Sequence, residues 1–166
     1  MTARRRAFMI IVALFMVTFI AVLALAFLST GAAGYKGALA SRVEAQALQL
    51  AYSGIEDARI KFERDPLFPP PAGEETKFFS YSENVHDLAG GPVIGSFDVT
   101  LDQTYVGAPY YLIRLRSTGR VTNGGQETKR QVKVEIDLSP TDRRVGHETD
   151  PNPNFFRIVQ CSEEGP

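Results

Sequence analysis

The side chains that most often build catalytic and metal sites are scarce in this chain of 166 residues, which has two histidines and one cysteine. The lone Cys161 allows neither an internal disulfide nor a metal cluster built on cysteines. His86 and His147 are not at metal-ligand spacing, and no expected strand is followed by a glycine-rich phosphate loop or a nucleophile elbow. We therefore predict that the chain is not an enzyme and that it holds no cofactor and no metal.

An excess of charge of either sign is also lacking, because 18 basic residues face 19 acidic ones and the net charge is −1. A nucleic-acid surface usually carries a basic stripe. The basic residues of the expected sheet are instead interleaved with Glu127, Glu135 and Asp137. We predict a solvated sheet face in preference to a DNA-uptake patch, and no nucleic-acid partner, for the set Arg116, Arg120, Lys129, Arg130 and Lys133.

Charge is absent altogether from residues 8–28, where Thr18 is the only polar side chain. As a helix, 21 such residues extend about 31 Å, which matches the hydrocarbon thickness of a bilayer. The basic cluster of residues 4–6 should stay cytoplasmic, since positive charge beside a span resists translocation. We predict a cytoplasmic leader over residues 1–7, a single membrane span over residues 8–28 and an exterior remainder.

A cleaved secretory signal and a plain uncleaved anchor are the alternatives to a processed span. Signal peptides have apolar regions of about 7–15 residues, shorter than the one here. Small residues at positions 29–33 nevertheless offer a possible cleavage site.

Proline is missing between residues 35 and 64, where the sequence continues to predict helix. Apolar residues recur there at steps of three and four, and Asp65-Pro66 supplies a stop. Residues 29–65 are therefore expected to continue the membrane helix as an amphipathic half. Its apolar stripe consists of Leu48, Ala51, Ile55, Ala58 and Phe62, preceded on a nearby stripe by Leu39, Val43 and Ala47.

Residues 66–140 are expected to form an antiparallel β domain. Period-two alternation predicts strands over residues 96–105, 110–116 and 131–138, and Asn123-Gly124-Gly125 is a strong hairpin signal. Phe78, Phe79 and Tyr81 indicate a further short strand or a packed loop. The helical stripe would cover the apolar sheet face, which gives an α+β fold.

Residues 141–166 show little periodicity, so we expect an irregular C-terminal tail. Four apolar residues near its end could dock as a final short strand or contact a partner: Phe155, Phe156, Ile158 and Val159.

Two stretches of this sequence resemble the type IV pilin superfamily, and within it the PilX-like minor pilins and the K-type minor pseudopilins of type II secretion. The first is the basic leader followed by Ala7 and Phe8, which opens the apolar helix. The second is the stretch QALQLAYSGIEDAR over residues 46–59. Its residues that carry the likeness are Gln46, Ala47, Leu50, Ala51, Gly54, Ile55, Glu56 and Ala58.

The resemblance implies that a prepilin peptidase cuts between Ala7 and Phe8 and methylates the new N-terminus. Most members have glycine where Ala7 stands, although alanine is a tolerated small residue. Major pilins carry a glutamate at the fifth mature position, which here is Val12, and no acidic residue occurs anywhere in the span. A subunit without that carboxylate is suited to the tip of a filament, as the K-type pseudopilins are. A simple membrane anchor has no use for a buried charge either, so this absence fits both interpretations.

Two functions from different classes follow as expectations. The preferred one is a minor pilin or pseudopilin that primes or caps a type IV pilus, a type II secretion filament or a DNA-uptake filament. Its partners would be other pilin or pseudopilin subunits, an inner-membrane assembly platform, the prepilin peptidase and membrane lipid. The alternative is a single-pass inner-membrane protein whose small exterior domain, periplasmic or extracellular, binds a ligand and never enters a filament. Some secretion pseudopilins bind calcium, but Asp98, Asp102 and Asp137 alternate with apolar residues, which favours solvated faces.

Overall fold

The computed structural model describes residues 2–65, 68–69 and 77–164, apart from the side chains of residues 2–8, 10, 11 and 89. Its single long helix is α1 (Thr2–Arg64), and the chain divides into two compact units, Met1–Arg42 and Val43–Pro166. The helix ends one residue before Asp65-Pro66, as the sequence predicts.

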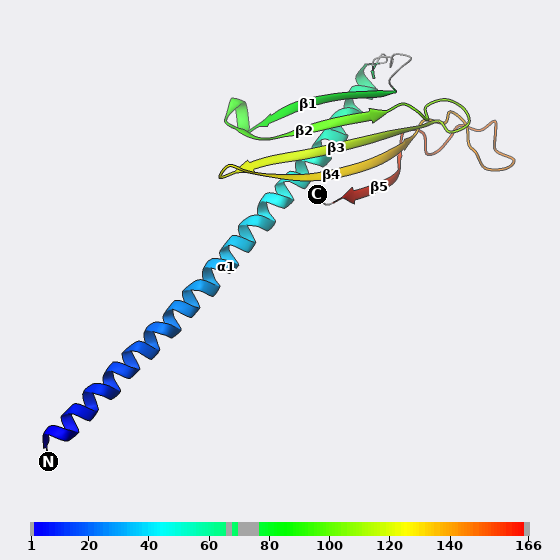
Figure 1. Ribbon diagram of the computed structural model, residues 1–166. Helices are drawn as coiled ribbons and strands as arrows, with labels where there is room; N and C mark the ends of the chain where they lie inside the picture. The colour runs from blue at the N-terminus through cyan, green and yellow to red at the C-terminus, as the bar shows by residue number, and fades with distance from the viewer. Residues whose placement is uncertain (1, 66–67, 70–76, 165–166) are drawn as a thin grey trace. The chain divides into compact units, whose positions relative to one another are not determined.

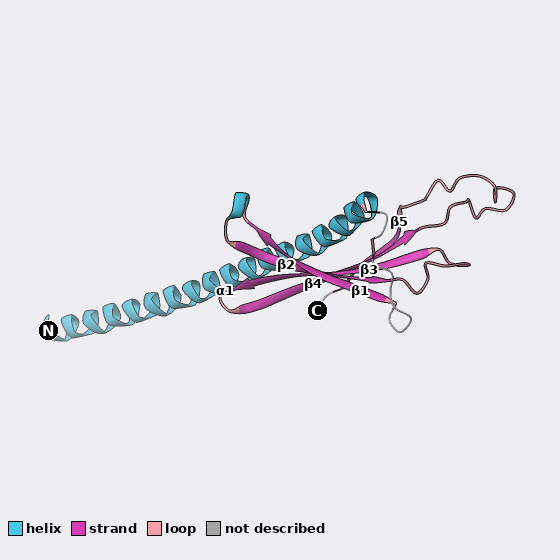
Figure 2. Cartoon of the chain, turned by 90° about the horizontal axis from the view of Figure 1, so that it is seen from above, coloured by secondary structure: helices cyan, strands magenta, loops and turns pink. Residues whose placement is uncertain are grey.

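The second unit contains an antiparallel sheet of five strands in the order β1-β2-β3-β4-β5 (Figure 1). Each strand pairs with the one before it in the chain, so the sheet is a simple meander. The C-terminal part of α1 lies along one face of this sheet (Figure 2). The predicted α+β architecture of a long N-terminal helix packed on an antiparallel sheet is confirmed. The strands are β1 (Phe78–His86), β2 (Val93–Asp102), β3 (Leu112–Asn123), β4 (Gln126–Asp137) and β5 (Ile158–Glu164), and a 3-10 turn, η1 (Leu88–Gly90), joins β1 to β2.

The three predicted strands correspond to β2, β3 and β4, although β3 and β4 are each longer than expected. The central strand, β3, continues past residue 116 to Asn123. The prediction ended too early because Ser117 and Gly119 occupy inward positions, where the alternating pattern requires apolar side chains. The predicted hairpin turn is confirmed: Gly124 and Gly125 have φ values of 58° and 83°, which glycine adopts without strain.

The predicted irregular tail is wrong for its last part, because the sheet does not stop at residue 140. After the loop that follows β4, residues 158–164 form β5 and pair with β4. The backbone N–H of Phe156 donates to the carbonyl of Asp137 at 2.7 Å, which brings the chain back to the sheet. All seven residues of β5 are exposed, since it is an edge strand, and this explains why its sequence lacks alternation. Docking of the tail as a final strand is the expectation that holds.

The hydrophobic core lies between the sheet and helix residues 43–62. Inward positions of β2, β3 and β4 are buried as predicted, including Phe97, Leu101, Ile113 and Ile136. On the helix the stripe is also confirmed where it meets the sheet, while Leu48 and Phe62 are partly buried. Leu39 is exposed. The helix residues that are buried are Val43, Ala47, Leu50, Ala51, Gly54, Ile55 and Ala58.

Candidate functional site: the apolar helix and the two faces of the sheet

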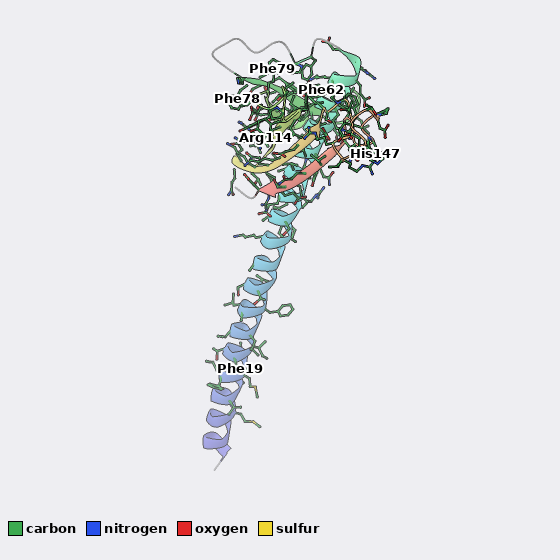
Figure 3. The ribbon with its side chains drawn as sticks, turned by 90° about the vertical axis from the view of Figure 1, so that its right-hand side faces the viewer. Phe19, Phe62, Phe78, Phe79, Arg114 and His147 are labelled. Atoms are coloured by element: carbon green, nitrogen blue, oxygen red, sulfur yellow. The ribbon has the colours of Figure 1, made fainter. Side chains whose placement is uncertain are left out.

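The N-terminal part of α1 exposes apolar side chains on all sides. Phe15, Phe19 and Phe27 are 71%, 54% and 82% exposed, and Phe19 is labelled in Figure 3. By length and composition α1 is long and apolar enough to cross a membrane. The few hydroxyls are bonded within the helix, as Thr18 donates to the carbonyl of Phe15 at 2.8 Å. This segment is therefore consistent with a single-pass membrane protein.

The predicted processing site is part of the same helix. The side chains of Ala7 and Phe8 lie outside the described part of the chain. Val12, where major pilins carry glutamate, is 43% exposed. From residue 12 to residue 28 the helix thus exposes an apolar surface, and the sequence has no carboxylate between residues 8 and 28.

The residues that carry the likeness to PilX-like proteins face the sheet, with two exceptions. Ala47, Ala51 and Ala58 have no exposed surface and pack in the core. The exceptions are Gln46, whose side-chain amide lies 3.5 Å from the carbonyl of Ile94, and Glu56, which is exposed. Within the compact unit that begins at Val43, called the head below, this stretch is a packing motif: three alanines and Gly54, together with Leu50 and Ile55, are buried where the helix contacts the sheet.

Glycine on both sides lets the helix and sheet approach closely. A Cβ atom on Gly119 of β3 would lie 2.0 Å from the carbonyl oxygen of Ala47 and 2.5 Å from the amide nitrogen of Ala51. A Cβ atom on Gly54 of the helix would lie 2.3 Å from the hydroxyl of Ser117. Sequence patterning did not identify this contact, because small residues carry no hydrophobic signal.

A polar cluster joins the last turns of α1 to β1. Asp57 accepts hydrogen bonds from Lys61 at 2.7 Å and from the hydroxyl of Tyr81 at 2.8 Å. Lys61 also pairs with Glu83 and lies 3.9 Å above the ring centre of Tyr81. Burial, followed by the bond to Asp57, raises the pKa of Tyr81. Burial alone would lower the pKa of Lys61, but its bonds to Asp57 and Glu83 raise it above the ordinary value.

Two further polar contacts join α1 to the other edge of the sheet. The Tyr52 hydroxyl donates to Glu163 of β5 at 2.5 Å, and this bond is the largest cause that raises the pKa of Tyr52 to about 12. Arg130 of β4 pairs with Glu44 at 2.7 Å. Arg130 is thus on the helix side of the sheet, whereas the sequence grouped it with the basic residues of the solvated face.

The opposite face of the sheet is open and charged. Its cations and carboxylates pair across strands, as for Arg114 with Glu135 and Arg120 with Asp98, both at 2.6 Å. The interleaving of signs seen in the sequence therefore becomes a set of cross-strand ion pairs. A groove of about 360 Å³ crosses this face at β2, β3, β4 and β5.

The remaining candidate residues lie apart from one another. His86 contacts the carbonyl of Gly91, and His147 pairs with Asp150. Asp102 accepts from the backbone of Thr104. Cys161 is an exposed free thiol. Among the residues that the structure describes, no group of three or more His, Cys, Asp or Glu side chains could hold a metal ion.

Asp137, the last residue of β4, accepts hydrogen bonds from the loop that follows this strand. It accepts from the backbone N–H of Ser139 at 2.8 Å and from the side-chain amide of Asn152 at 3.0 Å. The same amide donates to the carbonyl of Ser139 at 3.0 Å. Asp137 is therefore committed to holding the two ends of this loop together.

No protein-family model, curated protein or solved structure matches this chain. The function proposed below therefore depends on the residues and their geometry.

Proposed function

We propose that this protein is a minor pilin or pseudopilin, a structural subunit that primes or caps a type IV pilus or a type II secretion filament. The observation that carries the proposal is that two parts of one helix differ in what their apolar side chains contact. Residues 12–28 of α1 expose apolar side chains, whereas residues 43–62 of the same helix form one side of the head's core. A helix of this kind can exchange contact with lipid for contact with the helices of other subunits.

The absence of a carboxylate from the span supports a tip position in this proposal. A glutamate in lipid is expensive, and it is retained where it pairs with the terminal ammonium of a neighbour. Val12 offers no such partner. A subunit of this type therefore suits a place where no further subunit follows it.

Processing tests the proposal most directly. Intact mass and N-terminal sequencing of the protein from its native membranes should give a chain that starts at methylated Phe8. Because the peptidase needs a slim residue before the cut, Ala7→Gly should still be processed and Ala7→Leu should not. The Ala7→Gly variant controls for changes in expression and membrane insertion.

Two other results would each contradict the proposal. A mature chain that retains residues 4–6 would indicate an uncleaved anchor. A start near Gly31 would indicate an exported protein released by ordinary signal cleavage.

A single-pass membrane protein with an exterior binding domain is the second candidate function. The observation that favours it is the groove on the open face of the sheet, which could serve a head that stays at the membrane. The two candidates differ in the fate of the leader, so the same mass measurement separates them.

A further inference from the structure

The groove on the open face of the sheet is lined by three cations and two carboxylates, with the ring of Phe78 among its lining residues. Arg114 is paired with Glu135, whereas Arg116 and Lys133 lie side by side on neighbouring strands. We propose that the groove binds the carboxylate of an Asp or Glu side chain presented by a segment of another protein. The inference does not depend on the function proposed above, because a head in a filament and a head at a membrane would offer the same groove.

A row of five hydrogen-bond donors crosses all five strands, and all of them except Ser80 line the groove. Strand register places Ser80 opposite Thr100, Thr100 opposite Arg116, Arg116 opposite Lys133, and Lys133 opposite Ser162. The row holds two cations and three hydroxyls and no carboxylate. Ser80 donates to the hydroxyl of Thr100 at 3.0 Å, which leaves the Thr100 hydrogen free for another acceptor.

Arg116 is the unusual member of this row. Its neighbours Arg114 and Arg120 each have a carboxylate partner at 2.6 Å. Within the described part of the chain, exposed Arg116 forms no ion pair and lies directly opposite Lys133. Like charges directly opposite in a sheet are destabilising. A carboxylate bound between them would relieve this repulsion and match the planar fork of the guanidinium.

Lys133 already pairs with one carboxylate, Glu164 of β5, at 2.5 Å. That contact shows how an oxygen anion sits on this face: it reaches the cation from the side of a neighbouring strand. The corresponding places beside Arg116, on β2, hold Asp98 and Asp102, but Asp98 pairs with Arg120 at 2.6 Å and Asp102 accepts from the backbone N–H of Thr104 at 2.9 Å. Neither forms an ion pair with Arg116 in the described chain, so its guanidinium can bind a further carboxylate.

The rows on both sides of the donor row exclude a polyanion. One carries Asp102 and Glu135, and the other carries Asp98 and Glu164. A nucleic acid, with a phosphate at every nucleotide, would bring its charges against these carboxylates. A single carboxylate brings only one negative charge near these rows.

The shape of the groove favours a protein segment over a small free acid. Pockets for small ligands enclose most of the ligand's surface, whereas this groove lies on an exposed sheet face. Phe78, which lines the groove and is labelled with Arg114 in Figure 3, is 60% exposed. An acidic residue next to an apolar one could contact Arg116 and Phe78 together. The expected partner therefore presents an Asp or Glu adjacent to an aromatic or aliphatic side chain.

Titration calorimetry on the full chain in nanodiscs of neutral lipid would test this inference. The probes are the capped peptide Gly-Phe-Glu-Gly and its matched control Gly-Phe-Gln-Gly. We expect the glutamate peptide to bind at least about tenfold more tightly than the glutamine peptide, because a hydrogen bond to a charged group is lost in the control. Arg116→Gln should weaken binding of the glutamate peptide about tenfold.

Arg120→Gln is the matched control variant, since it removes the same charge from the same strand outside the donor row. It should change the affinity by less than about twofold, in line with a screened surface charge. Without ligand, Arg116→Gln should melt at a temperature equal to or above that of the parent chain, because the repulsion with Lys133 is gone; this also shows that the variant is folded.

Three outcomes would overturn the inference. One is equal binding of the two peptides, and another is equal weakening by Arg116→Gln and Arg120→Gln. The third is tighter binding of a short single-stranded DNA than of the glutamate peptide, which would make the face a nucleic-acid surface.

Discussion

At the scale of single residues, the helix and the sheet approach closely because the residues at their contact have small side chains or none. Gly54 and Gly119, with three alanines of α1, allow the backbone of the helix to contact the backbone of β3. Ser117, which has no exposed surface, contributes a hydroxyl to the same contact and has no hydrogen-bond partner among the described residues. A methyl group on Gly119 has no room, because its two nearest neighbours are backbone atoms of the helix, whereas one on Gly54 would meet side-chain atoms of Ser117, Phe97 and Val99.

Gly119→Ala should therefore lower the free energy of unfolding by about 3 kcal/mol, the upper part of the range for overpacked cores. Chemical denaturation followed by circular dichroism would measure it. Gly107→Ala is the matched control, since a Cβ atom there has no neighbour within 4 Å, and it should change stability by less than about 0.5 kcal/mol. Equal stability of the two variants would show that the helix does not lie this close to β3.

At the scale of elements, β5 is an edge strand that a side-chain hydrogen bond joins to the helix. It is short, exposed and at the edge of the sheet, and it pairs only with β4. The bond from Tyr52 to Glu163 joins it to α1. Because this bond needs the neutral phenol, it links the attachment of β5 to pH.

We expect Tyr52 to ionise near pH 12, against about 10 for a free tyrosine. A raised pKa means that the stabilisation is fully present below pH 10 and is lost as the pH rises through about 12. Glu163→Gln should move the ionisation of Tyr52 back toward 10, because the bond to Glu163 is the largest cause of the shift. The measurement is the ultraviolet absorbance of tyrosinate, taken as the difference between each protein and its Tyr52→Phe counterpart. An unchanged titration in Glu163→Gln would mean that the hydroxyl has another partner.

At the scale of the whole molecule, the head has a core of its own. Every buried residue in the described chain lies between Val43 and Asp142, within the second compact unit. Among the described side chains of the apolar segment before it, none is buried. Folding of the head should therefore not require the membrane segment.

A chain that begins at Tyr35 should fold in water and melt within about 5 °C of the full chain in nanodiscs, a difference that corresponds to about 1 kcal/mol for a domain of this size. Thermal melting followed by circular dichroism would measure both proteins. A matched chain that begins at Leu48 would lose Val43 and Ala47 from the core and should melt at a lower temperature. If the chain beginning at Tyr35 were unfolded, the membrane segment would have to be part of the folding unit.

Local chemistry in the sequence was sufficient to predict the apolar segment, the amphipathic stripe, the end of the helix and the hairpin at Asn123-Gly124-Gly125. Each of these depends on residues close together in the chain: a run without charge, a period of 3.6 or 2, a proline, or glycines that accept positive φ. For the same reason the α+β class could be predicted before the sheet order was known.

Only the tertiary structure decided which residues lie opposite one another. It placed β5 beside β4 although β5 has no alternation, and it placed Arg130 on the helix side and Arg116 opposite Lys133 on the open side. It also brought glycine against helix backbone, a contact that no hydrophobic pattern signals. These features depend on pairings between residues far apart in the chain, where strand register and close packing, and not local preference, determine the energy.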